Sequence, residues 1–528
     1  MDTEQKTTSR LENGPTIQKL DFEHEEQAAQ GTAAESRMSI WQALQFYRIA
    51  VMWSAIVSMA TVMESYMLIL VNSFYAYPQF LQRFGERLAD GSYTISTTWQ
   101  ISLTMSSLVG MIGGVFLNGL LIDRFGYRLT MMCCHILLIG FVFIMFFATS
   151  IQVLLIGCLF IAIPCGVFAA ATPGYAAEIC PMALRGYLTS FVNLNWVIGH
   201  LIAAGVLMSK LNDPTEWSWR LPLGVQWIWP PFLAVACWFA PESPWWLVRK
   251  GNTEEATRVL ERIIAAPDET ISKSNIVAMI SHTIATERSI GIGSTYLDCF
   301  RGTNRRRTEI AMVSWGCQIL PGFAIQNYIT YFFTLAGLSP SNSLKLALGN
   351  YSIAFLGTVL SWFVQRRFGR RDIYLTGLLV MVFPMALVGF LDLAPSSSTI
   401  RWVQSALLLV WFFCYGITIG PIPYAIAAEV GAVELRSKTI SLGRNTYYFL
   451  SILNTIVAPY MLNASAGNLK GKAAFPAAGF TLILAVWAFF RLPETKGLTP
   501  ETLDRLFVAK VPARRFLAES GQYSNAAE

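Results

Sequence analysis

The sequence predicts an all-α membrane protein whose twelve transmembrane helices form two related bundles of six. Three observations predict this fold class: an apolar composition, a series of apolar stretches, and an internal repeat. Hydrophobic residues make up 54% of the 528-residue chain and charged residues only 14%, whereas soluble domains usually carry about 25% charge. Because so few charges cannot solvate the surface of several soluble domains, we expect most of the chain to lie in lipid.

Twelve apolar stretches follow one another, each close to the length that a helix needs to cross the hydrocarbon core. Helix is favoured because a spanning segment must satisfy its own backbone hydrogen bonds. The stretches lie near 48–72, 98–122, 129–149, 151–172, 187–208, 222–240, 311–336, 346–365, 372–392, 402–426, 439–462 and 474–491. They predict an N-terminal tail (1–47), a first bundle (48–240), a polar helical linker (241–310), a second bundle (311–491) and a C-terminal tail (492–528).

The two halves carry the same short motifs in the same order. Segment 175–185 is echoed by 426–436, segment 123–128 by 366–371, and the tripeptide at 241–243 by that at 493–495. Each copy lies at the same end of the corresponding span. Two such parallel repeats, related by an axis along the membrane normal, enclose a cavity at mid-membrane, which is the architecture of alternating access.

Basic residues predict the orientation of the chain in the membrane. Lys and Arg are concentrated in the loops that share a side with both termini, including the short loops at 123–128 and 366–371. Because cytoplasmic loops carry such an excess, we expect both termini in the cytoplasm. The sequon at Asn463 then falls in an outer loop, where it is a candidate for glycosylation.

The repeated motifs resemble those of the sugar porters of the major facilitator superfamily, over about residues 45–510. The loop at 119–128, the segment 241–251 and the segment 493–497 match the signatures of these porters. The pair Trp245-Trp246, with 226–230 before it and 459–463 later, is similar to the fungal maltose and α-glucoside permeases. The resemblance implies transport of a sugar or α-glucoside by alternating access through the plasma membrane, with coupling to protons left open.

Charged residues gather where the repeats end. Carboxylates and guanidiniums at one end of the bundles can form bidentate pairs that hold the halves together while the cavity faces outward. Anchoring by the arginines alone is the alternative, but it does not explain the repeated glutamates. The resemblance implies a gate or latch made of Asp123, Arg124, Arg128, Glu178, Arg185 and Glu242 in one half and Arg370, Arg371, Glu429, Arg436 and Glu494 in the other.

A sugar needs amides and hydroxyls for its hydroxyl groups and aromatic rings for its apolar faces. By family position, the candidate substrate residues are His200, Gln318, Tyr328, Tyr424 and Asn454. Ordinary helix packing is the alternative for each. The chain departs from the family pattern where His200 replaces an amide, and where Ile319 and Ala324 replace a Gln and an Asn.

A proton-coupled carrier needs a carboxylate within the membrane. Of three carboxylates in proton-coupled α-glucoside permeases only Glu64 is present, since Met67 and Met111 occupy the other two positions. Glu64 is therefore a candidate proton carrier or substrate acceptor, with a protonated structural glutamate as the alternative. Segment 151–178 contains no Lys or Arg, so the family's cation there is missing as well.

Two other functions compete with sugar transport. A carrier of a non-sugar metabolite, working as an exporter, would suit the methionines near Glu64, and a nutrient sensor is disfavoured by the short C-terminal tail. The sequence shows no nucleophile, phosphate loop or metal-ligand spacing, and it predicts neither an enzyme nor a cofactor, metal or nucleic-acid partner.

Overall fold

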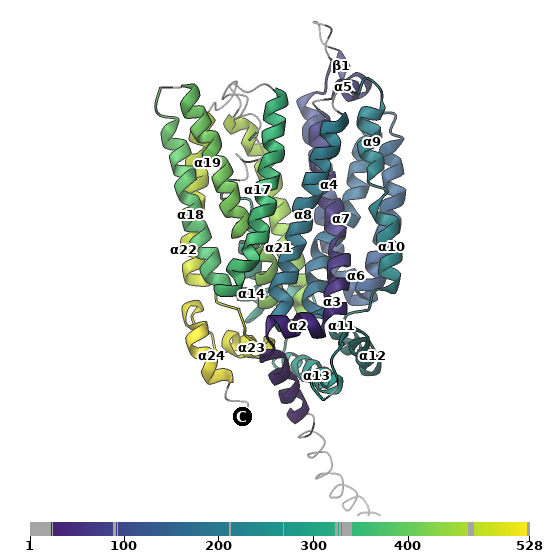
Figure 1. The fold of residues 1–528 in the computed structure, drawn as a ribbon, viewed down its shortest axis with the longest axis vertical. Helices are drawn as coiled ribbons and strands as arrows, with labels where there is room; N and C mark the ends of the chain where they lie inside the picture. Colours follow the sequence, from purple (N-terminus) through teal and green to yellow (C-terminus); the bar gives the residue numbers. More distant parts are fainter. Residues whose placement is uncertain are drawn as a thin grey trace, which may run out of the picture.

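The computed structural model describes residues 23, 25–75, 77–87, 91, 93–210, 213–267, 269–322, 326, 329, 340–395, 397–462 and 469–524. Long helices stand side by side in two groups, one from each half of the chain (Figure 1). The described part contains one small sheet, in which β1 (Glu86–Arg87) pairs antiparallel with β2 (Tyr93–Thr94). The expected all-α architecture is confirmed apart from this two-residue ladder.

The first group contains six spans. They are formed by α3 (Arg48–Ser58) with α4 (Ala60–Phe74), by α6 (Thr97–Phe146), α7 (Ile151–Ile179) and α8 (Met182–Lys210), and by α9 (Trp217–Val225) with α10 (Trp229–Phe239). Helix α6 supplies two spans because it breaks at Gly126, whose φ of 80° is a conformation that glycine adopts without strain. The short α5 (Pro78–Phe84) precedes the sheet.

The second group repeats this order. It contains α14 (Asn304–Gly316), α17 (Pro340–Arg367), α18 (Arg370–Leu391), α19 (Ser398–Ile417) with α20 (Ile422–Val430), α21 (Arg436–Leu462) and α22 (Ala474–Arg491). Within the described residues, eight segments are long and apolar enough to cross a bilayer. One of these eight is α6, which supplies two spans; its second span and the helices α14, α17 and α21 complete the twelve-helix fold in two bundles.

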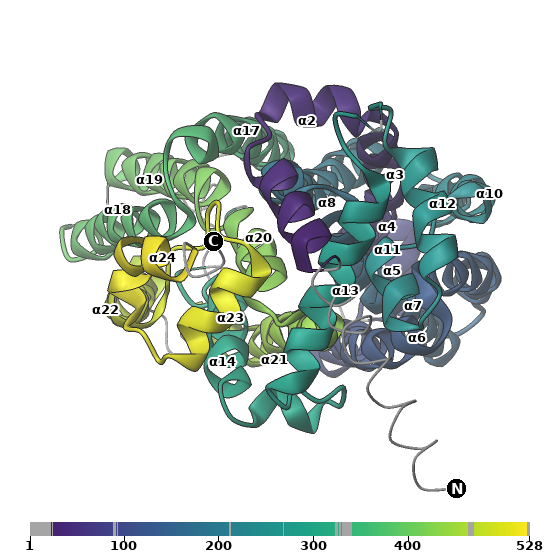
Figure 2. The ribbon, with the colours of Figure 1, turned by 90° about the horizontal axis from the view of Figure 1, so that it is seen from below.

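The remaining helices gather at one end of the bundles, which we call the linker end (bottom of Figure 1; facing the viewer in Figure 2). They are the N-terminal helix (residues 25–36), α2 (Ile40–Phe46), α11 (Pro244–Arg249), α12 (Thr253–Ile263), α13 (Lys273–Ser289), α23 (Pro500–Val508) and α24 (Phe516–Ser524). The 3₁₀ turns η1 (Leu297–Phe300), η2 (Val433–Leu435) and η4 (Ala513–Arg515) lie at the same end. The turn η3 (Lys470–Ala473) lies at the opposite end, between α21 and α22.

Apolar and polar side chains are distributed as lipid requires. Large apolar residues such as Phe363 and Phe383 are 69% and 70% exposed on the outer faces of the bundles. Charged residues such as Glu64 and Arg444 are instead fully buried between the helices. Because an ionised group inside a membrane protein is costly unless it is paired, such residues mark the candidate functional site.

Candidate functional site

An ion pair joins the two halves in the middle of the bundle. Glu64 of α4 and Arg444 of α21 are 0% and 1% exposed. Glu64 Oε1 accepts hydrogen bonds from Arg444 Nη2 and, at 2.6 Å, from the Tyr448 hydroxyl. Glu64 Oε2 has no hydrogen-bond partner among the described residues. One oxygen of this carboxylate therefore accepts both hydrogen bonds that the second half donates to Glu64.

Aromatic rings surround the guanidinium of Arg444. Its central carbon lies 4.5 Å from the ring centroid of Tyr447, 4.7 Å from Trp315, 5.0 Å from Tyr448 and 5.9 Å from Tyr424. Each ring face attracts the cation, and the attraction is stronger where water is excluded. The rings and Glu64 together make a buried positive charge tolerable.

Two of the predicted substrate residues lie near this cage. Tyr424 packs edge-on against Trp315 at 4.4 Å and is a wall of the cage. Gln318 donates through Nε2 to the carbonyl of Gly420 at 2.6 Å, where the chain breaks between α19 and α20. Asn454 lies farther along α21 and is half-buried, whereas Tyr328 is outside the described residues.

His200 lies at the contact between α8 and α17. Its Nδ1 is 3.1 Å from the carbonyl oxygen of Trp196, and its ring lies 3.9 Å from the Trp196 ring. The Tyr351 ring of the other half approaches it edge-on at 5.2 Å. The imidazole therefore faces the interface between the bundles. His135, by contrast, is fully buried within its own half and stacks on Phe168 at 4.4 Å.

At the linker end, two repeated glutamates make the same contact in each half. The Glu242 carboxylate accepts the backbone N–H groups of Tyr127 at 2.9 Å and Arg128 at 3.1 Å. The Glu494 carboxylate accepts those of Arg370 at 2.9 Å and Arg371 at 3.1 Å. Each carboxylate thus caps the start of the third span of its own bundle.

Each glutamate of the other repeated pair binds one arginine and one hydroxyl group. Glu178 pairs with Arg249 at 3.2 Å and accepts the Ser243 hydroxyl. Glu429 pairs with Arg370 at 3.1 Å and accepts the Thr495 hydroxyl at 2.5 Å. Glu178 thus holds Arg249, which also donates to the Val433 carbonyl of the second half, whereas Glu429 binds partners in its own half.

The remaining residues of the predicted latch also contact neighbours at the linker end. Arg185 Nε donates to the Ala177 carbonyl at 3.0 Å, and Arg371 Nε to that of Leu492 at 3.0 Å. Arg124 lies over Phe125, Arg128 over Trp238 and Arg436 over Trp245. Of these contacts, that between Arg436 and Trp245 links the second bundle to the linker.

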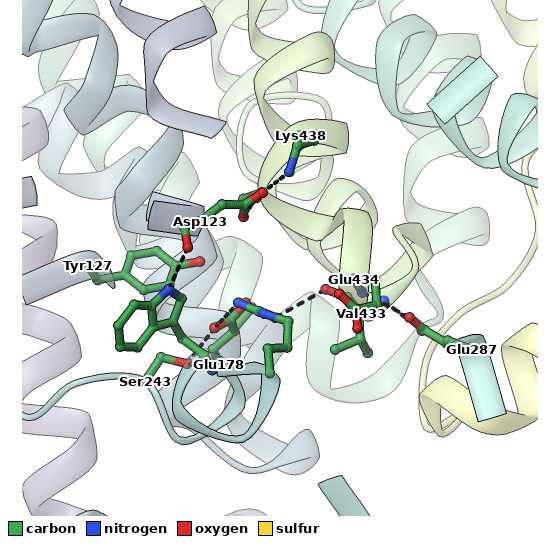
Figure 3. A network of polar contacts seen from close by, with 12 residues as sticks. Asp123, Tyr127, Glu178, Ser243, Glu287, Val433, Glu434 and Lys438 are labelled. Carbon is green, nitrogen blue, oxygen red and sulfur yellow. Dashed lines mark hydrogen bonds and ion pairs between the residues drawn. The ribbon is translucent and has the colours of Figure 1, made fainter. Parts of the chain in front are cut away.

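A separate set of contacts crosses between the halves (Figure 3). Asp123 of α6 pairs with Lys438 of α21 and accepts the Ser437 hydroxyl at 3.2 Å. From the linker, Arg249 donates to the Val433 carbonyl at 3.2 Å, and Arg288 pairs with Glu434 at 2.7 Å. Glu287 accepts the N–H groups of Val433 and Glu434 at 2.7 and 2.9 Å. The linker end is therefore closed in this structure.

Sequence reasoning missed Arg444, Lys438 and Glu287. Arg444 had a usable signal, because an arginine inside the apolar stretch 439–462 is as unusual as Glu64 in the first span. The sequence gives no such signal for Lys438 and Glu287, since charged residues at helix ends and in linkers are common. Asn463, the glycosylation candidate, is outside the described residues.

Comparisons with known proteins show the family of this chain. The family model "Sugar (and other) transporter" matches residues 53–507. A general alpha-glucoside permease of Saccharomyces cerevisiae is 36% identical over 494 residues, which cover 93% of this chain and 80% of the permease. A maltose permease of the same yeast is 35% identical over 511 residues, or 96% of this chain and 83% of the permease.

Solved structures of XylE from E. coli have the same fold. The proton:xylose symporter XylE bound to 6-bromo-6-deoxy-D-glucose is 21% identical and matches with a TM-score of 0.74, covering 88% of this chain and 100% of that chain. Its inward open conformation matches with a TM-score of 0.61 at 20% identity, covering 86% and 98%. The chain belongs to the sugar transporter family of the major facilitator superfamily, and it is a multi-pass membrane transporter of the sugar porter type rather than an enzyme.

Proposed function

We propose that this transporter carries an α-glucoside such as maltose through the plasma membrane by alternating access, with the linker end in the cytoplasm. The observation that carries the proposal is the identity of 36% to a general alpha-glucoside permease across 93% of the chain. The excess of Lys and Arg at the linker end supports the orientation. The contacts that close this end give the outward-facing state of such a cycle.

The sugar would bind between the bundles, next to the Arg444 cage. His200 is 7% exposed and lies at the interface of the halves, and Gln318 and Tyr424 sit beside the break between α19 and α20. Imidazole, amide and phenol groups can exchange hydrogen bonds with sugar hydroxyls, and rings can stack on the sugar's apolar faces. Asn454 and Tyr328 complete the proposed set.

Glu64 would couple the sugar to protons. Protonation removes its charge and so weakens the bond to Arg444, which belongs to the other half. Protonation of Glu64 is thereby coupled to the separation of the halves, as symport requires. The lack of a described partner for Oε2 leaves one oxygen available to take the proton.

Uptake by vesicles that contain the purified protein tests the proposal. We expect uptake of labelled maltose in preference to glucose, and accumulation of maltose when the outside is acidified. Glu64→Gln should abolish accumulation while retaining exchange of maltose, whereas the exposed Glu216→Gln should behave as the unmodified protein. Lack of uptake of every sugar would contradict the proposal and favour the non-sugar cargo, and uptake that ignores the pH gradient would remove the coupling role of Glu64.

A further inference from the structure

Two carboxylates from outside the bundles contact the same position of the repeat. In the matched segments 175–185 and 426–436, Met182 corresponds to Val433 and Arg185 to Arg436. Glu287 of α13 is 0% exposed and accepts the Val433 N–H at 2.7 Å, and it lies within electrostatic range of Arg436. In the other half, Glu35 of the N-terminal helix lies next to Arg185 and the Met182 amide: burial raises the pKa of its carboxyl, and these two neighbours lower it.

The two helices that carry these carboxylates pack directly on each other (Figure 2). The side-chain amide of Asn275 in α13 donates to the Gln30 side chain of the N-terminal helix at 2.9 Å. Gly31 lies so close to α13 that an added side-chain carbon would collide with the carbonyl oxygen of Asn275. Such an approach of two backbones requires glycine. Ala28, one turn earlier, is only 4% exposed.

We propose that the N-terminal helix and α13 form a single strap across the linker end, and that Glu35 and Glu287 are its positioning residues. Glu35 anchors the strap to the first bundle, and Glu287 holds it to the second. The inference rests on the proposed function only in naming the linker end as the cytoplasmic gate.

The two grips have different parts in the cycle. Glu35 belongs to the same half as the loop it contacts, whereas the bond from Glu287 to Val433 and Glu434 crosses between the halves. Opening of the linker end must therefore break the Glu287 grip, while the Glu35 anchor and the contact at Gly31 persist. An intact anchor keeps α13 in the place where Glu287 can bind again, so the N-terminal segment sets how readily the gate closes.

Hydrogen exchange of the full chain in lipid nanodiscs tests the strap without any substrate. Peptides that cover 179–186 and 430–437 report the amides of the two grips. Glu287→Ala should speed exchange of the second peptide by about ten-fold, because its amides lose their acceptor. Glu35→Ala should speed exchange of both peptides, because the anchor is shared. Glu25→Ala, an exposed change on the same N-terminal helix, should alter neither.

A second variant separates the strap from two independent caps. Gly31→Val keeps both carboxylates but wedges the two helices apart, so it should also speed exchange of both peptides. This variant keeps the test decisive if Glu35→Ala does not fold. The strap is overturned if Glu35→Ala affects the first peptide alone, or if Gly31→Val leaves both peptides protected. Since exchange is measured without transport, failure of the strap and failure of sugar uptake are distinguishable results.

Discussion

The buried pair of Glu64 and Arg444 places two opposite charges in a bundle interior. Desolvation of both groups offsets much of their attraction, so the intact pair adds little net stability. Loss of one partner is different, because the other charge then remains buried without compensation. The aromatic cage moderates this cost for Arg444 but has no equivalent for Glu64.

Glu64→Gln should destabilise the protein by about 3–5 kcal/mol, the usual cost of breaking a buried ion pair. Thermal unfolding in detergent, followed by size-exclusion chromatography of the heated protein, measures the loss. Tyr448→Phe is the matched control, since it removes one hydrogen bond to the same oxygen and should cost about 1–3 kcal/mol. The double variant Glu64→Gln, Arg444→Gln should lose less stability than the sum of the losses in Glu64→Gln alone and Arg444→Gln alone. A loss equal to that sum would contradict pairing of the two residues.

The proposed sugar site gives a role to His200. His200→Leu should raise the half-saturation concentration for maltose by about ten-fold, because the proposed hydrogen bond from the imidazole to a sugar hydroxyl is lost. His200→Gln, which restores an amide, should stay within about two-fold of the unmodified protein. Initial rates of uptake over a range of maltose concentrations give these values. His282→Leu in α13 is the control, and an unchanged half-saturation concentration in His200→Leu would remove this residue from the site.

At the scale of elements, η2 and the start of α21 receive the contacts that cross between the halves at the linker end. Asp123 of α6 holds Lys438 there, and the Lys438 side chain is 3% exposed while that of Asp123 is 34% exposed. A partly buried pair of this kind is screened less by salt than a surface pair. The first turn of α21 is therefore bound to the first bundle through this ion pair when the linker end is closed.

Asp123→Asn should shift the protein toward an open linker end, and the swap Asp123→Lys with Lys438→Asp should restore closure. Spin labels at the exposed Phe125 and Phe368, which are equivalent in the repeat, report the separation of the halves by electron–electron resonance. The accessible Cys133 and Cys414 are first replaced by serine. A swap that leaves the label distances as in Asp123→Asn would show that the charge pair is not what closes the gate.

The linker helix α13 should respond to pH through Glu287. The pKa of Glu287 is raised to about 7. Burial and the nearby charge of Asp504 in α23 raise it, while the backbone amides of η2 and the charge of Arg307 in α14 lower it. In the released helix the pKa returns to its ordinary value near 4.5. Because the bound state has the higher pKa, protonation favours closure, and that contribution is lost as pH rises through about 7.

Raising the pH on the linker side from about 6 to about 8 should therefore increase the open population seen with the same spin labels. Glu287→Gln, which cannot titrate, should remove most of this dependence. The negative charge of Asp504 disfavours ionisation of Glu287. Asp504 Oδ1 itself pairs with Arg307 Nη2 at 2.5 Å. An opposite trend with pH, or an equal response in Glu287→Gln, would assign the effect to another group.

At the scale of the whole molecule, the fold followed from patterns that are local in the sequence. Span length and the motif at 123–128 predicted helices and a loop between them, and the structure contains both, with the break at Gly126, because each depends on neighbouring residues. The seventh predicted span is described only as far as Gly322, with Gln326 and Ile329 beyond it. Tyr328 therefore stays a prediction.

The site was less predictable than the fold. Glu64 and Tyr424 were identified from the sequence, but their partner Arg444 was not. The family pattern places the cation in the fourth span, whereas Arg444 lies in α21. The repeated glutamates were expected to join the bundles. Glu178 reaches the second half only through Arg249, and Glu429 pairs with Arg370 of its own half. Equivalent motifs in two repeats indicate equivalent contacts, but not which half supplies the partner.

The sequence by itself determined that this protein crosses the membrane twelve times in two repeated halves, since apolar length and repetition are properties of the chain. Only the tertiary structure decided which charges meet. Glu64 reaches Arg444, Asp123 reaches Lys438, and Glu287 reaches Val433 through the packing of helices that lie far apart in the sequence. Such pairings depend on helix rotation and register, which no local pattern encodes.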